Sequence, residues 1–122
     1  MKIEIDFPDD LIEKVIDGIM SNFPEASQGS ALVCIDWRYN DKPVTEWTFA
    51  FVDSETDITY KIDYVDLKKA FPLIFTDKWP KGCTQPPATN NWDTWENWLC
   101  QCDAQDFDAF AQLVCLGEVI YG

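Results

Sequence analysis

The 122-residue sequence contains no histidine, and this absence narrows the chemistry that the chain can perform. Histidine is the commonest general acid or base near neutral pH and the commonest protein ligand for zinc and copper. Without an imidazole, a cysteine also lacks the partner that usually converts it into a thiolate nucleophile. We therefore expect a protein without enzymatic activity, without a bound metal and without a cofactor.

Basic residues are scarce as well. Nine Lys and Arg stand against 22 Asp and Glu, which gives a net charge of −13 at pH 7. Nucleic acids and anionic membrane surfaces attract proteins largely through Lys and Arg, so direct binding to nucleic acid or membrane is not expected. From residue 82 to 122 the sequence has no Lys or Arg at all, although surface helices normally mix both charge signs.

Long apolar stretches are also missing. The N-terminus has no apolar segment of the kind found in signal peptides, and no apolar run approaches the length of about 20 residues that spans a bilayer. The five cysteines are an odd number, which fits reduced thiols better than a framework of disulfides. These features predict a soluble, cytoplasmic protein.

Hydrophobic residues, in contrast, make up 47% of the chain, which is enough to form a folded core. A chain of this length is usually one domain, and it can bury a sizeable core without metals or disulfides. The longest connector, 79–91, contains prolines and a glycine, but the residues after it are too few for a second core. We therefore expect one domain spanning 1–122.

The N-terminal region predicts a strand and then a helix. Apolar and polar residues alternate over 2–7, which is the period of a half-buried strand. Over 10–23 the apolar residues recur at helical spacing, so one face of this helix should be buried. Asp10 and Glu13 have the spacing of a capping box, in which two side chains satisfy free backbone N–H groups at a helix start.

Three alternating runs in the middle of the chain predict a three-stranded antiparallel meander, because short polar connectors join them. The runs cover 31–39, 44–52 and 57–65. In the first run, alternation places five apolar residues on the same face of the strand: Ala31, Val33, Ile35, Trp37 and Tyr39. The helix over 10–23 should cover one face of this sheet. An aromatic sheet face left without a helix would be the interface of a homodimer.

The rest of the chain is predicted to be mainly helical. One turn is expected over 66–71, ended by Pro72. Two amphipathic helices should follow the connector, over 92–102 and 104–116, with a short strand over 118–122. The expected caps are Asn91, Asp103 and Gly117. The fold class is therefore α+β, with an N-terminal strand and helix, the meander, two C-terminal amphipathic helices, and a single layer of sheet covered by helices.

The tryptophans suggest two different roles. Trp92, Trp95 and Trp98 share one face of a predicted helix, which favours packing on the sheet, although a role in contacting a partner stays open. Trp79 lies between a lysine and a proline in a loop, so it is the candidate for an exposed aromatic anchor. Cys83, in the same loop, is the first candidate for an exposed and reactive thiol, although a passive loop cysteine is the favoured interpretation.

The negative charge gathers at both ends of the chain. Residues 1–37 and 82–122 each carry a net charge of −6, whereas 38–81 carries −1. Carboxylates at helix starts also favour the helix dipole and solubility, which explains part of this pattern. As residues that bind a partner with a basic surface we expect Asp10, Glu13, Asp17, Asp93, Glu96, Asp103, Asp106 and Asp108.

These observations predict a small acidic binding protein that is not an enzyme. The first hypothesis is a nucleic-acid mimic from a phage or mobile element, which would inhibit a nucleic-acid-binding protein or a defence nuclease, as anti-CRISPR and anti-restriction proteins do. The second is an immunity or antitoxin protein that neutralises one toxin. A third hypothesis, of another class, is a metal-dependent hydrolase that uses sheet carboxylates from Asp36, Glu46 or Asp63 beside Lys61.

Overall fold

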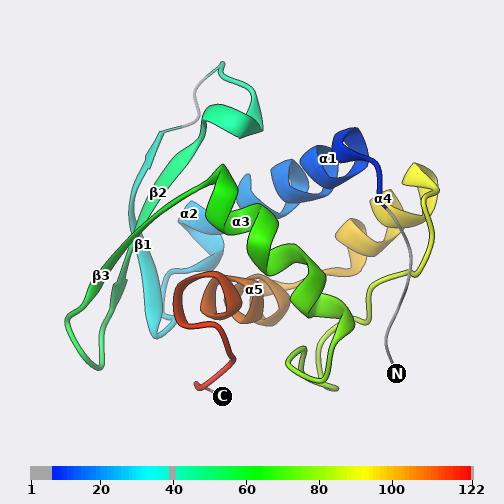
Figure 1. The fold of residues 1–122 in the computed structure, drawn as a ribbon. Coiled ribbons are helices and arrows are strands. Elements are labelled where there is room, and N and C mark those ends of the chain that lie inside the picture. The colour runs from blue at the N-terminus through cyan, green and yellow to red at the C-terminus, as the bar shows by residue number, and fades with distance from the viewer. Residues whose placement is uncertain (1–6, 39–40, 122) are drawn as a thin grey trace.

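The computed structural model describes residues 7–38 and 41–121, and a three-stranded antiparallel sheet lies on one side of it with helices on the other (Figure 1). This arrangement confirms the predicted α+β class. Residues 2–6 of the strand expected over 2–7, and Tyr39 of the strand expected over 31–39, lie outside the described residues, and Phe7 has no strand structure. In the described part of the chain, no helix is both long enough and apolar enough to cross a bilayer.

The N-terminal helix differs from its prediction at both ends. Helix α1 covers Asp9–Met20 and helix α2 covers Phe23–Ala26, so the single helix expected over 10–23 is in fact two helices. Pro8 occupies the N-cap position of α1, and the predicted capping box of Asp10 and Glu13 is wrong. Pro24 explains the break after Met20, because a proline lacks the N–H for helical bonding and clashes with the carbonyl four residues earlier.

The meander forms as predicted, in the order β1-β2-β3. Strand β1 covers Leu32–Arg38, β2 covers Thr48–Asp53 and β3 covers Thr59–Asp63. A short 3₁₀ helix, η1, covers Val44–Glu46 before β2. Neighbouring strands pair antiparallel throughout. The short polar connectors were therefore a sufficient signal for the topology.

The predicted facing of β1 is wrong. Cys34 pairs with Phe51, but the next pair joins Asp36 to Ala50, so Ile35 is an extra residue in a β-bulge. One inserted residue shifts the alternation of a strand from one face to the other. Already before the bulge the phase is the opposite of the predicted one, because residues 31–35 are all apolar and alternation does not select a face: Leu32 and Cys34 are buried, and Ile35 is 54% exposed.

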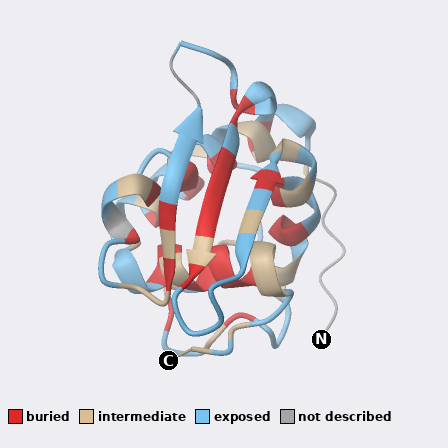
Figure 2. Ribbon diagram, turned by 90° about the vertical axis from the view of Figure 1, so that its left-hand side faces the viewer, coloured by how far each residue is buried: buried red, intermediate tan, exposed pale blue. Residues whose placement is uncertain are grey.

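The aromatic face of the sheet is covered by helices, and the opposite face is open (Figure 2). Phe49 and Phe51 of β2 are buried on the helical side. Phe23 of α2 meets Phe51 edge to face, with ring centres 5.4 Å apart, and it also contacts Phe107. The condition for an aromatic dimer interface, an uncovered aromatic sheet face, is therefore not met in this structure.

The helix after β3 begins earlier than expected. Helix α3 covers Tyr64–Ala70 and begins at a capping box of Asp63 and Asp66, which the prediction of one turn over 66–71 missed. Pro72 does not end the helical path. Instead the backbone tightens into a 3₁₀ helix, η2, over Phe71–Phe75, where a proline near the start loses no essential hydrogen bond.

The two C-terminal helices match the prediction most closely. Helix α4 covers Trp92–Gln101 and helix α5 covers Ala104–Leu116. Their caps are confirmed: Asn91 and Asp103 accept hydrogen bonds from backbone N–H groups, and Gly117 has a φ of 78° in the left-handed region. Trp95 and Trp98 are buried, which confirms a core position. The predicted packing on the sheet is not what the structure shows, because Trp95 packs on Phe71 and Phe75 of η2 and α4 lies against α1.

The end of the chain folds back without the predicted strand. Residues 118–121 have no regular secondary structure. The buried side chain of Gln112 accepts hydrogen bonds from the N–H groups of Ile120 and Tyr121 and donates to the carbonyl of Tyr121. The Tyr121 hydroxyl donates to Asp53 Oδ2 at 2.8 Å. Side-chain hydrogen bonds thus replace the ladder that a strand would have formed.

Candidate functional site

The eight acidic residues singled out by the sequence form two groups in the structure. One group lies on helices α1 and α4, which pack against each other, and we call it the α1/α4 face; it consists of Asp10, Glu13, Asp17, Asp93 and Glu96. The other group lies at the start of α5, and we call it the α5 acids; it consists of Asp103, Asp106 and Asp108. The predicted C-terminal patch is therefore divided between two places.

The side chains of the α1/α4 face remain available to solvent. Asp10, Asp17, Asp93 and Glu96 are exposed, and Glu13 is half-buried. Both helices lie within the described residues, and their sequences contain a single basic residue, Lys14. Lys68 of α3 pairs with Asp9 of α1 at 3.1 Å, but no ion pair among the described residues involves the five acids of this face, so the potential over it should be negative.

A close approach of the two helices shapes this face. A Cβ atom placed on Gly18 would lie 2.6 Å from Leu99 Cδ1, which is well inside normal contact distance. Glycine at this position thus lets the α4 side chain lie directly on the α1 backbone. This contact could not be predicted from the sequence, because 80 residues separate the two positions and no local interaction links them.

Between the helices runs an open groove of about 460 Å³, which we call the α1/α4 groove. Its lining residues are Lys14, Asp17, Gly18, Trp92, Glu96, Leu99 and Cys100. The Lys14 ammonium nitrogen lies 5.6 Å from the centre of the Trp92 ring, a cation–π distance. Asp17 and Glu96, one from each helix, both line this groove, and Asp17 Oδ1 accepts a hydrogen bond from the exposed Ser21 hydroxyl at 3.1 Å.

The α5 acids have a different environment, because Asp106 is buried. Only 3% of Asp106 is exposed, and its carboxylate accepts hydrogen bonds from the Thr84 N–H at 2.7 Å and the Thr84 hydroxyl at 2.8 Å. It also accepts from the Asp103 N–H at 3.0 Å, as part of the capping box of α5. The expectation that Asp106 contacts a partner is therefore wrong, since its carboxylate ties the long connector to α5.

Asp108 is half-buried. Its Oδ2 accepts a hydrogen bond from the Gln112 side chain at 2.9 Å, whereas its buried Oδ1 has no partner among the described residues. Burial raises the pKa of Asp108, against the smaller lowering effect of the Gln112 hydrogen bond. Of the α5 acids, Asp103 alone is exposed, so this group offers little negative surface.

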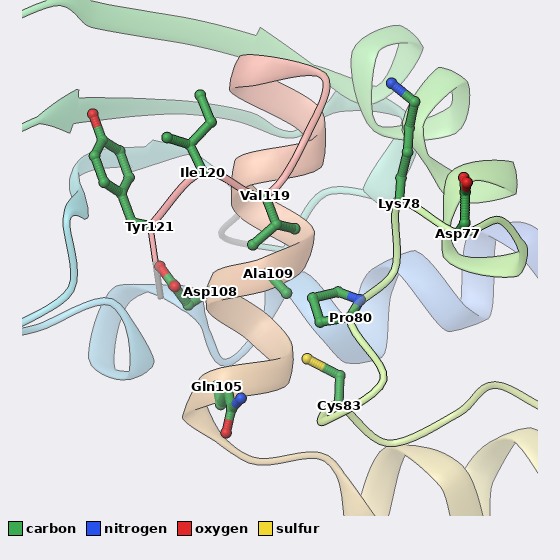
Figure 3. A pocket seen from close by; sticks show the side chains of 10 residues that line it. All are labelled: Asp77, Lys78, Pro80, Cys83, Gln105, Asp108, Ala109, Val119, Ile120 and Tyr121. Carbon is green, nitrogen blue, oxygen red and sulfur yellow. The ribbon is translucent and has the colours of Figure 1, made fainter.

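A cavity of about 380 Å³ lies beside the α5 acids, between α5, the connector and the C-terminal segment (Figure 3). Cys83 lines it but is buried, so it is not the exposed, reactive thiol that its loop position offered as an alternative. Burial, together with the charge of Asp106 and a hydrogen bond to it, raises the pKa of Cys83 to about 12. A thiol with so high a pKa stays protonated and is a poor nucleophile at neutral pH.

Trp79 is not an exposed anchor. It is 4% exposed, and its indole N–H donates to the Thr84 carbonyl at 3.1 Å. The indole N–H of Trp98 donates to the same carbonyl. Thr84 thus holds two tryptophans through its carbonyl and Asp106 through its N–H and hydroxyl. The prolines around Trp79 favoured a surface loop, but the connector packs inward because these hydrogen bonds satisfy its polar groups.

The carboxylates proposed for hydrolysis are only partly brought together. Asp36, Lys61 and Asp63 line one shallow depression of about 410 Å³ on the open face of the sheet, while Glu46 does not. Asp36 pairs with Arg38 at 3.3 Å, and Asp63 caps α3. No group of three or more His, Cys, Asp or Glu side chains suited to a metal ion occurs in residues 7–38 and 41–121.

Of the residues that line the α1/α4 groove, only Asp17 and Glu96 are among the site residues predicted from the sequence. Lys14, which provides the cation of the groove, is not among them, and for Trp92 core packing was favoured while a partner contact stayed open. The spacing of Trp92, Glu96 and Leu99 puts them on one helical face, which was a usable signal. Comparison of the chain with protein-family models, curated proteins and solved structures found no match.

Proposed function

We propose that the protein is a non-enzymatic inhibitor that binds the basic surface of a nucleic-acid-binding protein through its α1/α4 face. The observation that supports this proposal is the grouping of five carboxylates on two adjacent helices that carry a single lysine. Regularly placed negative charge on a folded surface can occupy the site that a nucleic acid would occupy. The five free cysteines are consistent with action in the reducing cytoplasm.

The binding mechanism combines long-range attraction with local contacts. The net charge of −13 steers the protein toward a basic surface and raises the association rate at low salt. Because a few well-packed contacts supply most of the affinity in protein interfaces, apolar groups near the carboxylates must also be buried. The α1/α4 face meets both requirements, since half-buried Trp92 and Leu99 lie among its acids.

A matched pair of variants tests the proposal. The first carries Asp10→Asn, Asp17→Asn and Glu96→Gln on the α1/α4 face. The second carries Glu55→Gln, Asp57→Asn and Glu118→Gln at exposed positions elsewhere, so it changes the net charge equally. We expect the first variant to lose partners captured from the lysate of the source organism at about 50 mM salt, and the second to keep most of them.

Two further conditions separate the proposal from its alternatives. Added double-stranded DNA or RNA should displace a captured partner, and raising the salt to about 300 mM should weaken capture. A single partner that stays bound at high salt and is not displaced by nucleic acid would instead identify an immunity or antitoxin protein. Equal losses from both variants would show that the acids only keep the protein soluble.

A metal-dependent hydrolase is the second candidate function. The observation that favours it is the depression shared by Asp36, Asp63 and Lys61 on the open sheet face. Two carboxylates can hold Mg²⁺ or Mn²⁺ when water and substrate supply the other ligands. Calorimetric titration with both ions decides the question: binding lost in an Asp36→Asn variant would support a hydrolase, and flat titrations would remove it.

A further inference from the structure

The α1/α4 groove already holds a cation over an aromatic ring. Lys14 is exposed and its ammonium lies 5.6 Å from the centre of the half-buried Trp92 ring. Leu99, also half-buried, extends the apolar floor beside that ring. The groove thus combines a cation-binding ring with apolar surface and two carboxylates, from Asp17 and Glu96.

The contact made by Lys14 is weak in the free protein because water surrounds the ammonium. Cation–π attraction grows when the cation and the ring are shielded from water, as they are under a bound partner. A guanidinium stacks on an indole and can also form two parallel hydrogen bonds with a carboxylate, which an ammonium cannot do. The combination of Trp92, Asp17 and Glu96 therefore fits an arginine better than a lysine.

We propose that the α1/α4 groove binds an arginine side chain from a basic protein segment, with the guanidinium replacing Lys14 on Trp92. Asp17 and Glu96 flank the bound guanidinium, and apolar residues next to the arginine lie on Leu99. The inference rests on the proposed function and adds the chemistry of the contact to it. Lys14 acts in this arrangement as an internal competitor that occupies the ring until the partner arrives.

A defined peptide tests this contact without knowledge of the partner. The probe is an acetylated and amidated peptide, Leu-Arg-Ala-Leu-Arg, compared with the same peptide carrying Lys or Glu in place of Arg. Binding to the full chain at low salt is followed by NMR through the Trp92 indole N–H and the Leu99 methyl signals. We expect the Arg peptide to shift these signals and to bind about 3-fold more tightly than the Lys peptide.

Variants of the groove sharpen the test. Lys14→Met removes the competing charge and keeps the aliphatic stem, so it should tighten binding of the Arg peptide. Lys81→Met removes the same charge from an exposed position in the connector and controls for net charge. We expect Lys14→Met to exceed Lys81→Met by about 3-fold in affinity. Trp92→Leu should abolish the preference for Arg over Lys.

The groove also contains its own reporter. Cys100 is exposed and lines the groove, so a bound Arg peptide should slow its alkylation by iodoacetamide. If Trp92→Leu lowers the unfolding temperature, its loss of binding cannot be assigned to the contact alone. The comparison of Lys14→Met with Lys81→Met then tests the inference, because both replaced side chains are exposed and neither change should disturb folding. Equal effects of these two lysine variants, or equal binding of the Arg and Lys peptides, would overturn the inference.

Failure of the inference and failure of the proposed function give different results. Salt-sensitive capture of a partner that persists in Trp92→Leu, together with no preference for the Arg peptide, would leave the proposed function intact and remove the arginine contact. The opposite result is also possible: the Arg peptide binds specifically in the groove, but neither salt nor nucleic acid weakens the capture of a partner. This result would support the arginine contact and contradict the function as a nucleic-acid mimic.

Discussion

The α1/α4 face and the α5 acids have similar sequences but opposite roles in the structure. Both regions contain several acidic residues, with little or no basic charge beside them in the sequence. On the α1/α4 face the carboxylates lie at the surface around an open groove. At the start of α5, Asp106 is buried and accepts three hydrogen bonds that fasten the connector.

The difference teaches that a count of charges does not locate a binding surface. A carboxylate that accepts several hydrogen bonds has its charge stabilised inside the protein, so it contributes to stability and not to partner contact. An exposed carboxylate without such bonds contributes little to stability and can pair with another molecule. Three experiments, from the largest expected effect to the smallest, can test this distinction.

Cysteine reactivity should differ most between the two regions. Burial, followed by the charges of Asp106 and Asp103, raises the pKa of Cys102 to about 12, and Cys83 has a pKa of about 12 as well. At pH 8 such thiols have a thiolate fraction about 10³-fold below that of a thiol at the ordinary value of 9.0. We expect iodoacetamide to modify exposed Cys100 first, measured by peptide mass spectrometry.

Modification of Cys83 or Cys102 as fast as Cys100 in the folded protein would contradict this expectation. In guanidinium all the thiols should react at similar rates, which is the control. The raised values also predict a pH dependence: above pH 9 the folded chain binds more protons at these thiols than the unfolded chain does, so the free energy of unfolding should fall as pH rises from 9 toward 12.

Removal of a buried carboxylate should have the next largest effect. Asp106→Ala leaves the Thr84 and Asp103 donors without their acceptor, and we expect the free energy of unfolding to fall by about 3 kcal/mol. Glu96→Ala, on the α1/α4 face, removes an exposed acid and should change it by less than about 0.5 kcal/mol. Urea denaturation of both variants measures the difference, and equal losses would erase the distinction between the two regions.

The smallest effect is expected at the base of the α1/α4 groove. Gly18→Ala gains about 1 kcal/mol from helix propensity but forces the flexible end of the Leu99 side chain to move. Stability should therefore change by no more than about 1 kcal/mol, while the Leu99 methyl signals shift in NMR spectra. A loss above about 2 kcal/mol would mean that Leu99 cannot move and that the groove is rigid at this point.

Helix ends were predictable wherever the signal lies within one turn. The ends of α4 and α5 lie at the expected caps, Asn91, Asp103 and Gly117, because each cap acts on backbone groups a few residues away. The same kind of reasoning failed at Asp10, where Pro8 starts the helix two residues earlier. It failed again in β1, because residues 31–35 are all apolar and alternation alone does not show which face of the strand is buried.

The candidate site was predictable only in pieces. Helical periodicity was enough to group Asp10, Glu13 and Asp17, because all three belong to one short helix. It could not bring Glu96 beside Asp17, since that neighbourhood depends on how two distant helices pack. The expected exposure of Trp79 failed for the same reason, because its indole N–H reaches the Thr84 carbonyl only when the connector packs inward.

Composition and local pattern settle the net charge, the amphipathic helices, the meander and most of the caps, because these depend on residue type and on interactions within a few residues. Tertiary packing alone decides which carboxylates stay in water, which thiols are accessible and which aromatic ring remains open to a cation. The physical reason is that burial and hydrogen bonding of a side chain depend on segments far away in the sequence, such as α1 and α4, that meet only in the folded chain.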